Sequence, residues 1–170
     1  MNNYTIDVSA VDLDGVTANY TEVIEVLYDL DEDLIWSEEF SADGPADLSK
    51  WTYEVDPPNN GSWWNDEDQH YTDREKNSYA SNGIFYIRAL RETFYFAGST
   101  KLYTSSRLKT QKKFSFKYGR VEIRAKLPSS QGTWPAVWML GSNVDSVSWP
   151  SCGEIDIIEQ FSDKSKNFST

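Results

Sequence analysis

Short β-type runs, separated by turn residues, recur along most of the chain and limit what it can fold into. "IFYIRAL" follows the turn signal Asn82-Gly83, and "PAVWML" begins at Pro135. In residues 121–127, apolar Val, Ile, Ala and Leu alternate with Glu, Arg and Lys, which is typical of a half-buried strand. No long segment shows a helical period with caps. Because short strands with Gly, Pro and Asn turns build sandwiches and barrels, the sequence predicts an all-β fold.

The first 29 residues predict a strand pair of their own. "YTIDVSAV" and "ANYTEVIEV" are rich in β-type residues, and Asp14-Gly15 between them is a hairpin turn signal. The pair resembles the C-terminal hairpin of an immunoglobulin-like accessory module, in which case residues 30–33 form a linker to a main domain at 34–170. The alternative is a strand pair that belongs to the main domain itself.

The net charge of the chain disfavours anionic binding partners. The chain carries 27 acidic and 16 basic residues, a net charge of −11, so it should repel nucleic-acid phosphates and anionic membrane surfaces. We therefore expect a neutral partner. No apolar run is long enough for a transmembrane helix, and the N-terminus lacks the features of a signal peptide.

One cysteine, Cys152, and one histidine, His70, cannot build an intrachain disulfide or a structural zinc site. Any Cys-His or Ser-His-Asp mechanism would have to use His70, which lies in the polar stretch "NDEDQHYTD". We predict instead a strand or loop histidine on a polar face.

Residues 153–161, "GEIDIIEQF", place three carboxylates among large apolar residues. The isoleucines favour a strand over a helix. On a strand, Glu154 and Asp156 share one face, the isoleucine after each acid faces the core, and Glu159 would face the core as well. Because a buried carboxylate is costly, we predict a β-bulge at Ile157-Ile158 that returns Glu159 to the face of Glu154.

This arrangement fits the chemistry of sugar hydrolysis. If the strand curves, Glu154 and Glu159 approach the carboxyl separation of about 5–5.5 Å that a retaining glycosidase uses. Asp156 lies between them, where it can hydrogen-bond the nucleophile and help to divide the protons among the acids. Three carboxylates can also hold Mg²⁺ or Ca²⁺, and three acids on a solvated strand face is the remaining interpretation. The Trp and Tyr residues nearby favour sugar over metal chemistry.

The same stretch resembles a known signature. "GEIDIIE" is similar to the catalytic signature of glycoside hydrolase family 16 in its bulged Glu-x-Asp-x-x-Glu form. Further segments resemble that family in order, among them "LSKWTYEV", "WNDEDQHYTD", "YTSSRLKT" and "GTWPAVWMLG". The run over residues 34–161 is similar to the laminarinase branch, which consists of endo-acting β-1,3-glucanases.

The resemblance implies a concanavalin-like jelly roll, a β-sandwich of two curved antiparallel sheets whose concave face binds a polysaccharide. Glu154 is then the nucleophile and Glu159 the general acid/base, with Asp156 assisting between them. A full sandwich of this kind has roughly 200–250 residues. We therefore expect residues 34–170 to be the N-terminal part of a catalytic domain, incomplete at its C-terminus, and this fragment alone need not be active.

Four further residues match substrate-binding positions of the family. Trp134 and Trp138 match positions that line the cleft, and Asn65 and Arg107 match polar residues that contact sugar hydroxyls. Aromatic rings cover the apolar C–H faces of sugars, while polar groups fix their orientation. The alternative for the two tryptophans is the sandwich core.

Some members of the family hold a structural calcium ion. Glu39 and the backbone of Gly83 match its usual ligand positions, and no other cofactor is implied. An acidic ligand expected from the last strands has no counterpart in this sequence.

The predicted function is retaining endo-hydrolysis of β-1,3-glucan, a neutral polysaccharide, with neither nucleic acid nor membrane as a partner. The parent protein is expected outside the cell or at its surface. The alternatives are a related hydrolase of mixed-linkage glucan or algal galactan, and a carbohydrate-binding fragment without catalysis.

Overall fold

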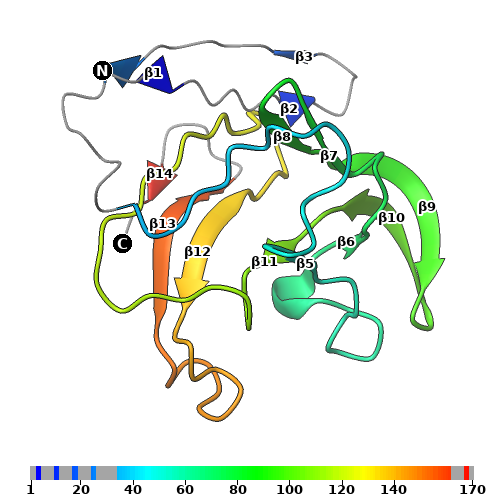
Figure 1. Ribbon diagram of the computed structural model, residues 1–170. Helices are drawn as coiled ribbons and strands as arrows, with labels where there is room; N and C mark the ends of the chain where they lie inside the picture. Colours follow the sequence, from blue (N-terminus) through cyan, green and yellow to red (C-terminus); the bar gives the residue numbers. More distant parts are fainter. Residues whose placement is uncertain are drawn as a thin grey trace.

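The computed structural model describes residues 34–161 and, through their backbone pairing, four short fragments before this range and one after it. The regular secondary structure of this part is almost entirely strand, and its one helical element is a 3₁₀ turn, η1 (Trp64–Asp66) (Figure 1). None of its helical residues forms a span long and apolar enough to cross a membrane. The all-β prediction is confirmed.

The strands are, in chain order, β1 (Asn3–Tyr4), β2 (Ala10–Val11), β3 (Thr17–Ala18), β4 (Ile24–Glu25), β5 (Thr52–Tyr53), β6 (Gln69–Tyr71), β7 (Ser78–Ser81), β8 (Ile84–Ile87), β9 (Leu90–Phe96), β10 (Ser99–Ser105), β11 (Leu108–Lys109), β12 (Ala136–Leu140), β13 (Glu154–Gln160) and β14 (Asn167–Phe168).

The longest strands form two separate three-stranded sheets. In one sheet β10 lies between β6, which is parallel to it, and β9, which is antiparallel. In the other sheet β13 lies between β12 and β14, and both pairings are antiparallel. The hairpin β7–β8 and the pair β5–β11 are the other strand pairings within residues 34–161. The guanidinium of Arg107 lies near the rings of both Tyr71 of β6 and Trp138 of β12 and so links the two sheets.

A small aromatic core lies on one face of the β7–β8 hairpin. Ala80 of β7 pairs with Phe85 of β8, and both side chains are buried. Strand alternation sends this pair to one face and the neighbouring pair Tyr79–Tyr86 to the other. Phe40 stacks on Phe85 with ring centroids 4.7 Å apart. Burial of the Phe85 ring contributes about 1.5–3 kcal/mol to folding. The partly buried residues that surround this core are Phe40, Trp51, Tyr53 and Leu108.

A polar network ties the segment before β7 to β9 and β10. Asn77 is fully buried, accepts a hydrogen bond from Arg74 at 2.8 Å and donates one to Thr104 at 3.0 Å. Glu92 of β9 accepts hydrogen bonds from Arg74, at 2.5 Å, and from Lys76 and Thr104. Burial alone would raise the pKa of Glu92, but the hydrogen bonds from Lys76, Thr104 and Arg74 outweigh it and lower the pKa to about 2.

We expect Glu92→Gln to lower the free energy of unfolding by about 1–2 kcal/mol at neutral pH, with allowance for the partial exposure of its ion pairs. The pKa of Glu92 in the folded state, about 2, lies below its ordinary value of 4.5. The contribution of ionised Glu92 to the free energy of unfolding is therefore complete above pH 4.5 and is lost as the pH falls through about 2. Urea unfolding of the full chain across this range measures the effect, with Asp73→Asn at an exposed position as the control. A difference between wild type and Glu92→Gln that did not shrink on acidification would contradict the assignment.

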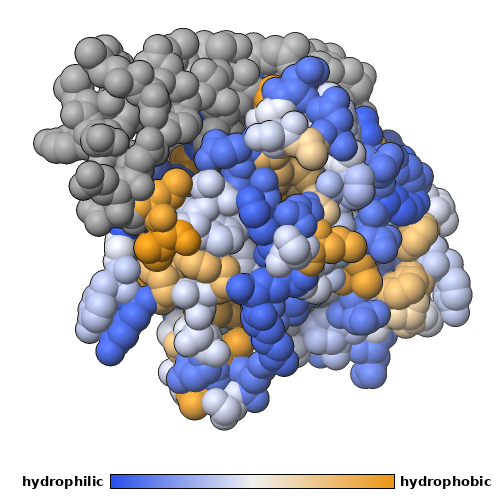
Figure 2. Space-filling view, viewed as in Figure 1, coloured by the Kyte–Doolittle hydropathy of each residue, from blue (hydrophilic) through white to orange (hydrophobic). Residues whose placement is uncertain are grey.

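The strand predicted at residues 121–127 is wrong. None of the described strands pairs with these residues, and the apolar Val121 and Ile123 are 40% and 45% exposed. Alternation gives a segment one apolar face, but a strand forms only where a second strand pairs with its backbone. Leu34 and Ile35 are also exposed. Figure 2 shows hydrophobic side chains as separate patches on a mostly hydrophilic face.

Two short ladders are described within the first 29 residues. β1 pairs with β4 and β2 with β3, both antiparallel and in a common register, which is the pairing that a hairpin requires. The predicted turn at Asp14-Gly15 and the linker at 30–33 lie outside the described residues. The accessory module therefore stays a prediction.

Candidate active site

The three acids lie on β13, whose ladder with β12 contains a bulge. Asp156 pairs with Trp138 and Ile158 pairs with Val137, so Ile157 is the extra residue. The predicted bulge at Ile157-Ile158 is confirmed. One extra residue in β13 restores the alternation that the third acid needs to avoid the apolar face.

The register places all three acids on one face of the sheet. They pair in turn with Leu140, Trp138 and Ala136, which are alternate residues of β12 and so share a face. The first acid is exposed and the other two are half-buried. Ile155 pairs with Met139 on the opposite face and is 54% exposed, so the prediction that it reaches a core is wrong. The alternation rule predicted correctly that Ile155 lies on the face opposite the acids, but no described element covers that face.

Trp134 fixes the orientation of the third acid. Its indole Nε1 donates a hydrogen bond to Oε1 of Glu159 at 2.8 Å. The ring itself lies against Phe161, with centroids 4.8 Å apart. The backbone N–H of Gln160 donates to the carbonyl of Pro135 at 3.1 Å, which extends the ladder to this point. The bond uses Oε1 alone of the two carboxylate oxygens.

Arg107 brings a second group of side chains to the same face. The central carbon of its guanidinium lies 5.0 Å from the ring of Trp138, 5.6 Å from Trp63 and 5.9 Å from Tyr71. Its Nε lies 2.6 Å from a carboxylate oxygen of Glu54. A guanidinium surrounded by aromatic rings and held by a carboxylate has a fixed position. Because Trp138 pairs with the central acid, the predicted residues Arg107 and Trp138 lie together beside the acids.

Tyr71 contributes a hydroxyl that stays protonated at neutral pH. Burial raises the pKa of the Tyr71 hydroxyl far above its ordinary range, and the charge of Glu67 and its hydrogen bond raise it further. The hydroxyl donates to Glu67 at 2.8 Å, and the side-chain amide of Gln69 donates to the same oxygen at 2.6 Å. Sequence reasoning missed Glu54, Trp63 and Tyr71 as site residues. All three lie within the quoted family-like segments or beside them, but the sequence does not show that these segments meet.

Asn65 lies on η1, two residues after Trp63. Its φ of 58° is in the left-handed region, which asparagine tolerates better than most residues, and its side chain is exposed. None of the hydrogen bonds described here joins Asn65 to the three acids. Its role in the site therefore rests on the family resemblance.

The interpretation of His70 as a polar-face histidine is wrong. His70 is fully buried on β6, and the rings of Phe94 and Phe96 lie edge-on at 6.1 and 6.0 Å. Its neighbours in sequence are polar, but the rings of Phe94 and Phe96 on β9 and the hydrogen bonds to Ser99 of β10 surround its side chain. None of its interactions within the described residues involves the acids, so nothing supports a histidine-based nucleophilic mechanism.

The two residues predicted to bind calcium lie near each other. A Cβ atom built on Gly83 would lie 4.0 Å from the carbonyl oxygen of Glu39. Residues 34–161 contain no group of three or more Asp, Glu, His or Cys side chains placed to hold a metal ion. Backbone carbonyls and water also serve as calcium ligands, so the calcium site stays a prediction. No step of the mechanism below depends on it.

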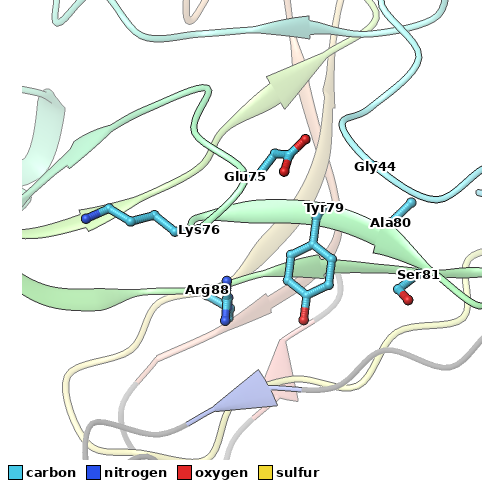
Figure 3. A pocket seen from close by; sticks show the side chains of 7 residues that line it. All are labelled: Gly44, Glu75, Lys76, Tyr79, Ala80, Ser81 and Arg88. Atoms are coloured by element: carbon cyan, nitrogen blue, oxygen red, sulfur yellow. The ribbon is translucent and has the colours of Figure 1, made fainter.

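A separate hollow of about 410 Å³ lies beside the β7–β8 hairpin (Figure 3). Glu75, Lys76, Arg88 and Tyr79 line it. The Tyr79 ring already has two neighbours, because Tyr86 stacks on it at 4.8 Å and the guanidinium of Arg88 lies 4.8 Å from its centroid. The hollow thus offers little aromatic surface to a sugar, whereas the face of β12 and β13 combines acids with aromatic rings. We place the candidate active site on that face.

Comparison with known proteins gives a consistent result. Residues 50–170 match a family model described as "XgeA-like, catalytic GH16 domain". The beta-glucanase of Rhodothermus marinus is 45% identical over 130 residues, which are 75% of this chain and 43% of that protein. The structure of LamAcat from Zobellia galactanivorans is 54% identical with a TM-score of 0.71, over 75% of this chain and 54% of that one. A LamA variant from the same organism, solved with laminaritriose and laminaritetraose, is 52% identical with a TM-score of 0.71, over 74% of this chain and 54% of that one. The chain thus spans about half the length of these relatives.

Proposed function

Because the chain belongs to glycoside hydrolase family 16, we propose that it carries the acid-bearing part of a domain that cleaves β-1,3-glucan internally with retention of configuration. The observation that carries this proposal is the bulged β12–β13 ladder, which puts three acids on one face beside two tryptophans. The likeness to LamA supports the further inference that the described sheets are parts of a jelly-roll sandwich.

Glu154 and Glu159 divide the chemistry between them. In the first step the carboxylate of Glu154 attacks the anomeric carbon, the bond to the leaving oxygen breaks, and Glu159 gives its proton to that oxygen. In the second step Glu159 takes a proton from water, whose oxygen attacks the same carbon and releases Glu154. Asp156 lies on the same face between the two glutamates, where it helps to hold the nucleophile.

Trp134 supports the role of Glu159 as proton donor. Its N–H donates to one carboxylate oxygen of Glu159, and the other oxygen is the one that would carry the proton to the glycosidic oxygen. A fixed donor lowers the orientational cost of proton transfer, and such placement is a large part of enzymatic rate enhancement.

Trp138, Arg107 and Asn65 form the sugar-binding part of this proposal. The indole of Trp138 covers an apolar sugar face, while the guanidinium and amide donate to hydroxyls. The acids and the net charge of −11 disfavour sulfated or carboxylated chains, so the substrate is a neutral glucan. An insoluble or high-molecular-weight glucan is met outside the cell or at its surface, which is where we place the parent protein.

The experiment that tests this function supplies the rest of the domain from a relative. In a hybrid domain, residues 34–161 of this chain replace the matching segment of LamAcat. We expect the hybrid to release a series of laminari-oligosaccharides from laminarin, with the β-anomer first in NMR spectra. Unaltered LamAcat is the control, and mixed-linkage glucan and agarose are the competing substrates. Cleavage of agarose alone, release of the α-anomer, or an inert hybrid that binds laminarin normally would each overturn the proposal.

A further inference from the structure

His70 is the one histidine in the chain, and the proposed reaction does not use it. It is fully buried, with its Nε2 3.1 Å from the hydroxyl oxygen of Ser99 and 3.2 Å from the Ser99 carbonyl oxygen. The Ser99 hydroxyl is in turn hydrogen-bonded to the carbonyl of Gly61. These contacts link β6, the start of β10 and the loop before η1.

The direction of these hydrogen bonds follows from the groups involved. The carbonyls of Gly61 and Ser99 can only accept, so the single hydroxyl proton of Ser99 goes to Gly61. The Ser99 hydroxyl oxygen must then accept from His70, which places a proton on Nε2. Within the described residues Nδ1 of His70 is buried and has no hydrogen-bond partner. The Ser99 contacts therefore require a proton on Nε2 of His70.

The loop held by Ser99 packs closely against the β9–β10 turn. Gly61 is buried with a φ of 87°, and a Cβ atom there would lie 2.6 Å from the carbonyl oxygen of Ala97. Such an approach is too close for any side chain, so glycine is required at this position. The position of this loop therefore depends on the hydrogen bonds that hold Gly61 in place.

The same loop carries residues of the candidate active site. Two residues after Gly61, Trp63 is 3% exposed and lies edge-on to Tyr71 with centroids 4.7 Å apart. Arg107 lies 5.6 Å above the Trp63 ring. Asn65 follows on η1. We call residues 59–67 the Trp63 loop.

We infer that His70 is a positioning residue, which holds the Trp63 loop in its glucan-binding position through Ser99 and Gly61. The inference rests on the proposed function, because the loop position matters for binding only if Trp63, Asn65 and Arg107 contact the glucan. His70 itself touches no substrate. Its contribution is to keep the loop closed against β10.

The test compares variants of the full chain that keep or remove the Nε2 donor. His70→Leu keeps apolar volume without a donor, whereas His70→Gln keeps an amide N–H at nearly the same reach. Ser99→Ala removes the hydroxyl that joins His70 to Gly61. Thr100→Ala, at an exposed position of β10, is the control. Amide hydrogen exchange in residues 59–67 of the full chain reports the loop, and exchange in β9 and β10 reports the sheet. Tryptophan fluorescence of the same variants in the hybrid domain reports laminaritriose binding.

We expect exchange in the Trp63 loop to rise about tenfold in His70→Leu and in Ser99→Ala, with little change in β9. Laminaritriose affinity should fall about three- to tenfold in the same two variants and recover in His70→Gln.

If His70→Leu unfolds the whole sheet, the result for Ser99→Ala decides the test, because this variant removes one hydroxyl only. Unchanged loop exchange in Ser99→Ala, or a His70→Gln variant as perturbed as His70→Leu, would overturn the inference. A parent hybrid domain that fails to bind laminaritriose, with the exchange pattern as expected, would refute the proposed function and leave the loop-positioning role of His70 intact.

Discussion

Glu154→Ala and Glu159→Ala should each reduce laminarin hydrolysis by the hybrid domain at least about 10³-fold, but for different reasons. Without Glu154 no covalent glycosyl-enzyme forms. Without Glu159 the leaving oxygen receives no proton, although Glu154 can still attack a substrate whose leaving group needs none. An aryl glycoside with an activated leaving group therefore separates the two roles.

Added azide distinguishes the roles of Glu154 and Glu159, because the two variants give glycosyl azides of opposite anomeric configuration. In Glu159→Ala, azide attacks the glycosyl-enzyme from the face opposite Glu154, and the product is a β-glycosyl azide. In Glu154→Ala, azide occupies the place of the missing carboxylate, displaces the leaving group of a bound β-glycoside directly and gives the α-glycosyl azide. NMR of the purified products distinguishes the two anomers. Asp156→Asn, the control on the same face, should slow both steps without changing the anomer.

Two results would count against this assignment. If Glu159→Ala gave the α-azide and Glu154→Ala the β-azide, the two glutamates would have exchanged roles. If both variants kept wild-type hydrolysis of laminarin, the acid face of β13 would not be the active site.

The acid face was predictable because it depends on local rules. Alternation along a strand and the cost of burying Glu159 are enough to require a bulge after Asp156, and the ladder contains it at Ile157. Neither argument needs to know which strand lies beside β13. The direction of Ile155 was predictable for the same reason.

Features that depend on neighbouring segments were not predictable in this way. Residues 121–127 alternate as a strand should, yet no described strand pairs with them. His70 lies among polar neighbours in the sequence, and its burial depends on Phe94, Phe96 and Ser99, which come from β9 and β10. The position of Arg107 depends on Glu54 and on three rings from separate segments, contacts that no local pattern encodes.

Deletion of single isoleucines from β13 should affect activity very differently, depending on which one is removed. Without Ile157, Ile158 still pairs with Val137 and the third acid still pairs with Ala136. The bulge is lost, but all three acids keep their face of the sheet. We expect this variant of the hybrid domain to keep activity within about 100-fold of the parent, with the loss due to altered strand twist and curvature.

Without Ile155, the acids no longer share a face. If the pairing of Asp156 with Trp138 is kept, Glu154 moves to the position opposite Met139, on the other side of the sheet. The proposed nucleophile then points away from the substrate, and hydrolysis should fall at least about 10³-fold, as in Glu154→Ala. The two deletions remove the same residue type from one strand, two positions apart, so each controls for the general cost of shortening β13. Circular dichroism and laminaritriose binding measure whether both variants fold. Because the register alone distinguishes them, equal activity in two folded variants would show that the common face of the three acids is not what the reaction requires.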